Sequence, residues 1–225
     1  AVATESAWPT PDEQTALGAI WGAPFLFMRI AAKDFGAFAL VEVRLVLGAV
    51  ILLPFLIRAR DQFTRAHWWK IVGIAAINTA FPFTLFAWAP LRAPAGIGAI
   101  TNAMAVMFTA LMAFVLYGER IDSRRIVGLL LGFVGVAVLA SGKTAGGSVL
   151  SAALAGTCAA FMYGVGGNLI RRHLVGIAPG AVAAATLVCS SILLAPLAVA
   201  TWPTTPIPAL SWASAGALGV VCSGI

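Results

Sequence analysis

The chain has 225 residues, of which 61% are hydrophobic and only 10% charged, and its formal net charge is +6. Its mean hydropathy is +0.98. A soluble domain is roughly half apolar and about a quarter charged, so this composition excludes a soluble enzyme, a secreted disulfide-rich domain and a disordered chain. The apolar runs are long and continuous, unlike the short alternating segments of a membrane β-barrel. The sequence therefore predicts an all-α fold, a polytopic bundle of membrane-spanning helices.

Eight windows have the length and composition of a spanning helix, which needs ~20 predominantly apolar residues. They are 15–32, 35–57, 71–91, 96–118, 126–142, 149–170, 179–200 and a last one that begins near 209 and is still apolar at Ile225. The chain is therefore expected to stop within its eighth helix. Because a helix cut in mid-span would end without support in the bilayer, we expect the sequence to be truncated. Residues 1–14 are polar and form a predicted N-terminal tail.

The basic residues predict the orientation of the bundle. The loops after the second, fourth and sixth windows hold Arg58, Arg60, Arg65, Lys70, Arg120, Arg124, Arg125, Arg171 and Arg172, whereas the opposite loops hold only Lys33, Arg92 and Lys143. Because short basic loops remain in the cytoplasm, the N-terminal tail is predicted to lie on the cytoplasmic side of the inner (cytoplasmic) membrane. Basic residues in such loops set topology, so nucleic acid is not an expected partner.

The chain also contains an internal repeat at an offset of 142 positions. This shift places Trp21-Gly22 on Tyr163-Gly164, Arg29 on Arg171, and Pro54 on Pro196. The predicted units are 15–142, with five spans, and an incomplete second unit, 143–225. An odd number of spans inverts the second unit in the membrane, which is the inverted-repeat plan of many secondary transporters. On this plan the intact protein has ten helices.

Several motifs resemble the drug/metabolite transporter superfamily, specifically its EamA-type ten-helix exporters. They are Trp21-Gly22, the basic residues Arg29 and Arg44, the segment Leu116-Tyr117-Gly118-Glu119-Arg120, and the Gly- and Leu-rich stretch 128–142. Two positions depart from the pattern: Val106, where many relatives have Pro, and the acidic Glu42. The resemblance implies export of amino acids or other small metabolites by alternating access around a central cavity.

Three charged side chains fall within the first two windows: Arg29, Glu42 and Arg44. An ionisable group in mid-membrane costs ~2.5–3.5 kcal/mol on insertion scales, so each is a candidate functional residue. One interpretation is a buried Arg29–Glu42 ion pair that joins two antiparallel helices across a loop at Lys33-Asp34. The other is a cluster of net positive charge that attracts the anionic group of a substrate. Proton coupling through Glu42 is a third interpretation.

Other polar and aromatic side chains within the windows complete the predicted substrate-binding set: Trp21, Asn78, Trp88, Asn102 and Tyr163. A buried Asn commonly bridges two helices by hydrogen bonding, and this structural role is the simpler reading of Asn78 and Asn102. The family resemblance places both on segments that line the central cavity. The aromatic residues are candidates to line the same cavity.

The sequence contains no motif for catalysis, for a metal or for a cofactor. Gly142-Lys143-Thr144 resembles the end of a phosphate-binding loop, but the glycine required five positions earlier is Ala137. We therefore predict that the protein is not an enzyme and uses no cofactor or metal. A proton gradient or another ion gradient would supply the energy.

Three functions remain open. The first is a secondary-active exporter of amino acids or related organic acids. The second is an exporter of cationic drugs or quaternary amines that uses Glu42, and the third is a structural membrane protein that transports nothing. The expected partners are a small-molecule substrate and the lipid bilayer. The sequence does not decide whether the chain forms a homodimer.

Overall fold

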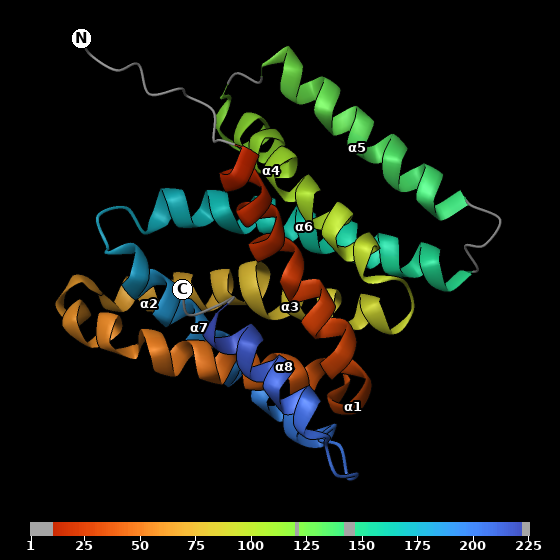
Figure 1. Cartoon of the computed structure of the whole chain (residues 1–225). Helices are drawn as coiled ribbons and strands as arrows, with labels where there is room; N and C mark the ends of the chain where they lie inside the picture. Colours follow the sequence, from red (N-terminus) through yellow and green to blue (C-terminus); the bar gives the residue numbers. More distant parts are fainter. Residues whose placement is uncertain (1–10, 120–121, 142–146, 222–225) are drawn as a thin grey trace.

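The computed structural model describes residues 11–119, 122–141 and 147–221, and every regular element in these ranges is helical. The elements are α1 (Pro11–Arg58), η1 (Arg60–Gln62), α2 (Arg65–Ala75), η2 (Ala76–Ala80), α3 (Phe81–Trp88), η3 (Ala89–Leu91), α4 (Ala95–Tyr117), α5 (Ser123–Ser141), α6 (Gly147–His173), α7 (Pro179–Ala200) and α8 (Ala209–Val220). The described residues of each of the eight predicted windows fall almost entirely on helix, which confirms the all-α bundle (Figure 1).

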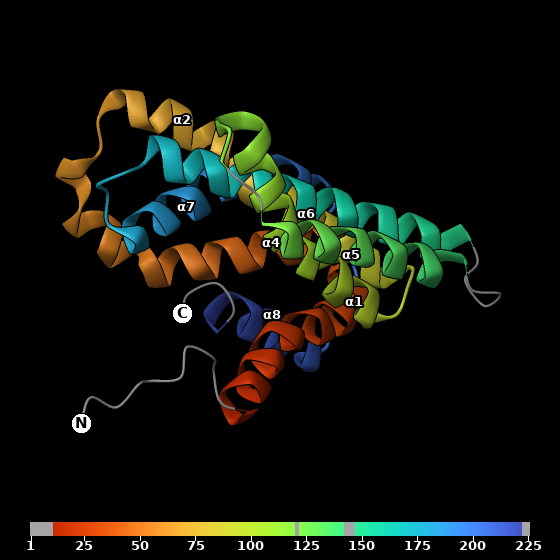
Figure 2. The ribbon, with the colours of Figure 1, turned by 90° about the horizontal axis from the view of Figure 1, so that it is seen from above.

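Helix α1 contains the first two predicted spans. Its apolar stretch Gly22–Arg58 has 37 residues, which would make a straight rod of ~55 Å, longer than the ~30 Å hydrocarbon core. The stretch bends at Gly36, whose φ of 72° and ψ of 173° suit only glycine. Lys33 and Asp34, which we expected in the connecting loop, are still helical. The two halves of α1 diverge from the bend in both ribbon views (Figures 1 and 2).

The third span is built from α2, η2 and α3 in succession. Its middle is a π-helix, Ala76–Ala80, which ends two residues before Pro82. Proline has no N–H to donate to the carbonyl of Asn78 four residues earlier, so the regular ladder is interrupted at this point. Ser190 of α7 donates to the carbonyl oxygen of Ala75 at 3.0 Å and ties this irregular segment to its neighbour.

The helices pack in two groups. The first half of α1 contacts α3 and α4, where Phe25 meets the ring of Phe86 edge to face and lies against Gly98. The second half of α1 packs on α7 and α8, and α8 runs parallel to it, with Trp212 on Phe35 near the bend and Gly219 against Leu47 further along. Helix α5 contacts α4 and α6 and lies at the edge of the bundle (Figure 1).

Small residues let α4 and α6 approach closely along parallel axes. Gly156, Ala160 and Gly164 are spaced by four along α6, and all three are buried. A Cβ added at Gly164 would lie 2.7 Å from the carbonyl carbon of Phe108, so the two backbones are in contact. Such stripes of small residues are typical of membrane helix pairs, because they replace bulky side chains with backbone contact.

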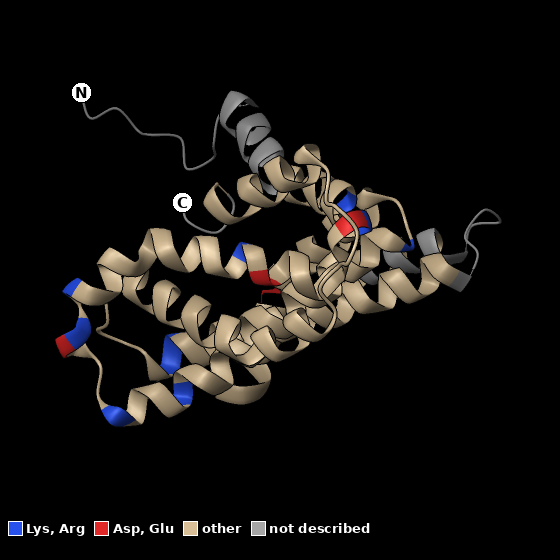
Figure 3. Ribbon diagram, turned by 90° about the horizontal axis from the view of Figure 1, so that it is seen from below, with Lys and Arg blue, Asp and Glu red and all other residues tan. Residues whose placement is uncertain are grey.

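The ends of the bundle differ in charge. The α1–α2 and α6–α7 turns are adjacent, since the backbone N–H of Ala178 donates to Gln62 Oε1 at 2.9 Å. Arg172 lies over the ring of Tyr117, which brings the end of α4 to the same place. Figure 3 shows basic segments gathered at this end. The described basic residues of these turns and of the helix ends beside them are Arg58, Arg60, Arg65, Lys70, Arg124, Arg125, Arg171 and Arg172.

We predict that Gly164→Ala destabilises the protein by ~1–3 kcal/mol, because its methyl group cannot be accommodated unless the backbone of α4 moves. Gly167→Ala is the matched control on the same helix, with nothing within 4 Å of the added Cβ. It should be neutral or slightly stabilising, since Ala favours helix over Gly. Thermal unfolding of the two purified variants in detergent checks this, and equal melting temperatures would contradict the close α4–α6 contact.

Candidate functional site

Arg44 lies at the centre of an aromatic cluster. Only 8% of the residue is exposed, and the guanidinium carbon is 3.8 Å from the ring centroid of Phe83 on α3. Arg44 is eight residues beyond Gly36, and Phe83 is eight residues before the end of η3, so each lies ~12 Å inside its span. A cation over an aromatic face is stabilised electrostatically, which offsets part of the cost of burial.

Tyr163 brings α6 into the same cluster. Its ring stacks on Phe86 with centroids 5.8 Å apart and meets Phe83 edge to face at 6.3 Å. It is close enough to Arg44 for the two to interact electrostatically. The cluster of Arg44, Phe83, Phe86 and Tyr163 therefore joins the second, third and sixth spans. It provides one fixed positive charge and a phenolic hydroxyl within an apolar wall.

Glu42 faces a different neighbour from Arg44. Two positions along a helix correspond to a rotation of ~200°, so the two side chains leave α1 on nearly opposite sides. Glu42 Oε1 accepts a hydrogen bond from Ser191 Oγ of α7. Its other oxygen, Oε2, is shielded from solvent and has no hydrogen-bond partner among the described residues.

The interpretation of Arg29 and Glu42 as a buried ion pair is wrong. Arg29 Nη1 instead donates to the carbonyl oxygen of Ala93 in the α3–α4 turn, at 3.5 Å. The described ion pairs are Arg60–Asp61 and Arg171–Glu119. The expectation assumed a hairpin folded at Lys33-Asp34. The actual bend lies at Gly36 and spreads the two halves of α1, so Arg29 turns to the end of the bundle and Glu42 to α7.

The remaining predicted residues are dispersed. Trp88 carries Arg92 over its ring at 3.7 Å, at the end of the bundle opposite the basic turns. Asn78 lies in the π-helix against Gly166, where an added Cβ would be 2.5 Å from its side chain. Asn102 is partly buried and makes no hydrogen bond within the described part of the chain. The side chain of Trp21 lies outside the described residues.

Two polar residues outside the predicted substrate-binding set join helices. Asn168 is 1% exposed and donates to the carbonyl oxygens of Thr109, at 2.9 Å, and Gly164, at 2.8 Å. Its own oxygen accepts from Arg171 at 3.2 Å. Ser191 is the second, through its bond to Glu42. The sequence signals Asn168, a polar amide four residues after Gly164 on the small-residue stripe, as a helix-bridging residue. It does not indicate a partner for Ser191.

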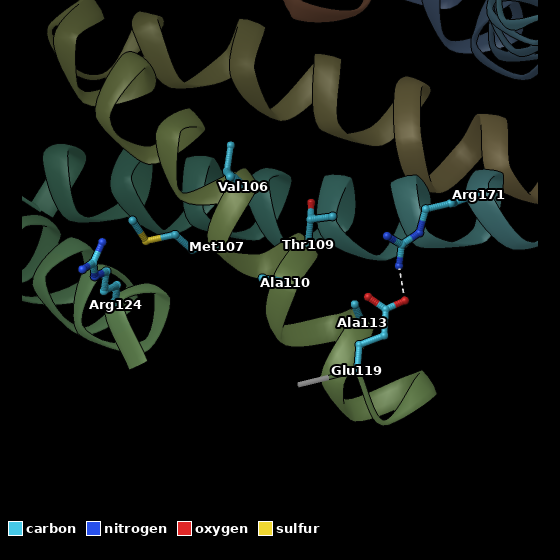
Figure 4. Close-up of a pocket in the computed structure, with 8 residues that line it drawn as sticks. All are labelled: Val106, Met107, Thr109, Ala110, Ala113, Glu119, Arg124 and Arg171. Atoms are coloured by element: carbon cyan, nitrogen blue, oxygen red, sulfur yellow. Dashed lines mark hydrogen bonds and ion pairs between the residues drawn. The ribbon is translucent and has the colours of Figure 1, made fainter. Parts of the chain in front are cut away.

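A cavity of about 550 Å³ lies between α4, α5 and α6 (Figure 4). One end is polar, where Arg171 Nη2 binds Glu119 Oε1 at 2.5 Å, and the rest is formed largely by α4. None of the seven predicted site residues whose side chains are described lines it. Its lining residues are Val106, Met107, Thr109, Ala110, Ala113, Glu119, Arg124 and Arg171.

Residues 15–141, more than half of the chain, match the model of the EamA-like transporter family. The chain belongs to that family. This EamA-like protein is therefore a multi-pass membrane transporter of small molecules, which agrees with the resemblance seen in its motifs. No curated protein matches its sequence significantly. One protein of known crystal structure is similar, with a TM-score of 0.62 and 19% identity over 94% of this chain and 76% of that one. At that identity the similarity establishes the fold alone.

We predict that Asn168→Leu destabilises this EamA-like protein by ~1 kcal/mol, because it removes the hydrogen bond between α6 and α4. Asn102→Leu is the control, since Asn102 has no such bond among the described residues. The detergent composition at the midpoint of SDS-induced unfolding measures the difference. Equal midpoints for the two variants would show that the Asn168 bond contributes nothing to stability.

Proposed function

We propose that the protein is a secondary-active exporter of small metabolites, amino acids or related organic acids, and that Arg44 binds the carboxylate of the substrate. The observation that carries this proposal is the position of Arg44, buried ~12 Å inside its span beside Phe83 and Tyr163. A guanidinium presents parallel N–H donors that match a carboxylate, and burial in an apolar wall strengthens such a bond. Tyr163 would supply a further donor.

The helix bounds support the proposed repeat. Helix α7 begins at Pro179 and ends at Ala200, which are 142 positions after Ala37 and Arg58. The second half of α1, from the bend at Gly36 to Arg58, therefore has the same length and register as α7. We place α1 to α5 in one unit and α6 to α8 in the second. Alternating access would then be a rocking of one unit against the other around the Arg44 cluster.

The charged ends support an orientation. Short loops rich in Lys and Arg remain in the cytoplasm, so we place the basic end of the bundle, with the N-terminal tail, on the cytoplasmic side of the inner membrane. Substrate would enter the Arg44 cluster from that side. An ion gradient would drive its release at the end that carries Lys33 and Arg92.

Counterflow in proteoliposomes tests the function. Purified protein should exchange labelled amino acids or organic acids in a saturable manner, and Arg44→Gln should reduce the exchange at least tenfold. Arg92→Gln is the matched control, because Arg92 also stacks on an aromatic ring but is exposed at the end of the bundle. It should exchange within about twofold of the unmodified protein.

Arg44→Lys distinguishes a binding role from a folding role. Lysine keeps the positive charge but lacks the planar fork, so we expect folded protein with an apparent affinity weakened about tenfold or more. Exchange of quaternary amines alone would replace this proposal by the cationic-drug reading that uses Glu42. No exchange of any labelled compound by folded protein would favour the structural, non-transporting reading.

A further inference from the structure

We propose that Glu42 and Ser191 form a proton-binding site, separate from the Arg44 cluster, through which a proton gradient drives transport. The inference rests on the proposed transport function and adds the identity and the place of the coupling ion. Its basis is the lone carboxylate oxygen of Glu42 inside the bundle. Oε1 is bonded to Ser191, whereas Oε2 is shielded from solvent without a partner among the described residues.

The unpartnered oxygen of Glu42, Oε2, is a hydrogen-bond acceptor without a donor among the described residues. A polar atom withdrawn from water without a hydrogen bond is unfavourable, and the penalty is larger when the group is charged. Protonation of Oε2 removes the charge, and a neutral carboxyl group is less costly to hold away from water than a carboxylate. A carboxyl group of this kind within a membrane span is the usual element of a proton relay.

Among the described residues, the surroundings of Glu42 offer no basic partner. Contacts of Phe83, Ser191 and Gly219 place α3, α7 and α8 against this half of α1, and the described residues of these three helices include no acidic or basic side chain. The thiol Cys189 is titratable, but it packs in the apolar cluster with Ile71 and Ile74 of α2. The nearest charged residue along the chain, Arg44, is directed to α3 and α6, where Tyr163 lies.

The donor set fits a proton better than a metal cation. One carboxylate and one hydroxyl provide too few oxygen ligands for a hard cation, which takes about six or more. The described residues also hold no group of three or more His, Cys, Asp or Glu side chains. A proton needs only the free lone pair of Oε2.

The location of the pair explains how a proton could affect transport. Glu42 belongs to the first proposed unit and Ser191 to the second, so their bond crosses between the units. When Oε2 is deprotonated, Glu42 is a charged acceptor for the hydroxyl of Ser191. When Oε2 is protonated, Glu42 is a neutral acceptor, and the hydrogen bond from Ser191 is weaker. One proton bound from one side and released on the other therefore changes the contact between the units once per cycle.

Infrared difference spectroscopy tests the site without any substrate. When the pH is raised, the membrane-reconstituted protein should lose the carbonyl stretching band of the protonated carboxyl group of Glu42. Glu42→Gln should remove this band, and Ser191→Ala should shift it. Asp34→Asn is the matched control, because Asp34 also accepts a bond from a serine, Ser211 of α8, but lies at the bend of α1. A band that persists in Glu42→Gln, or that Asp34→Asn removes, would overturn the proposal.

A transport measurement separates this inference from the proposed function. The readout is the ratio of uptake driven by a pH gradient to counterflow at equal pH. We expect Glu42→Gln to lower the ratio about tenfold and Asp34→Asn to leave it unchanged. A ratio unaffected by Glu42→Gln contradicts the proton site while transport stands. Absence of counterflow in the unmodified protein contradicts the proposed function, and the infrared result still decides the proton site.

Discussion

The absence of water in the bilayer is the constraint on which this structure depends. A polar group placed inside the bundle is satisfied at low cost only by a partner within the protein. Asn168 satisfies this by bonding α4, Ser190 by bonding the carbonyl beside the π-helix, and Arg44 by stacking on Phe83. Each of these contacts also joins two helices. The same polar side chains that are costly in an apolar medium therefore fix how the spans are arranged.

Small residues bring the helices close enough for these polar contacts to form. The stripe of Gly156, Ala160 and Gly164 lets α6 lie against α4, and Asn168 follows one turn later at the height of Thr109. A bulkier residue on the stripe would move the amide away from its acceptor. Close packing and polar bonding are thus parts of one interface, and we place this interface between the two proposed units.

The sequence predicted the helices well because hydropathy alone determines which segments can cross a membrane. Helix α7 was expected at 179–200 and is found at those residues. The partners of individual side chains were harder to predict from the sequence, because they depend on the angles between helices. The Arg29–Glu42 pair failed for this reason, since a shift of the bend by two residues to Gly36 spreads the halves of α1. The bond from Ser191 to Glu42 joins residues 149 positions apart, and nothing local foretells it.

The second half of α1 has two functional faces under the proposed mechanism. Arg44 faces α3 and α6, and Glu42 faces α7, so one rigid helix would hold the substrate on one side and the proton on the other. This arrangement keeps the two opposite charges from neutralising each other across the helix. It also means that movement of this helix would affect both ligands together.

Ligand-induced thermal stabilisation tests the central claim, recognition of a carboxylate by Arg44, most directly. A ligand that binds only the folded state raises the melting temperature, by an amount that grows with the ratio of its free concentration to its Kd. The account predicts that an amino acid or organic acid stabilises the purified protein, that its amide or ester does not, and that Arg44→Gln abolishes the shift. Equal stabilisation by the acid and its uncharged amide, or a shift retained in Arg44→Gln, would contradict it.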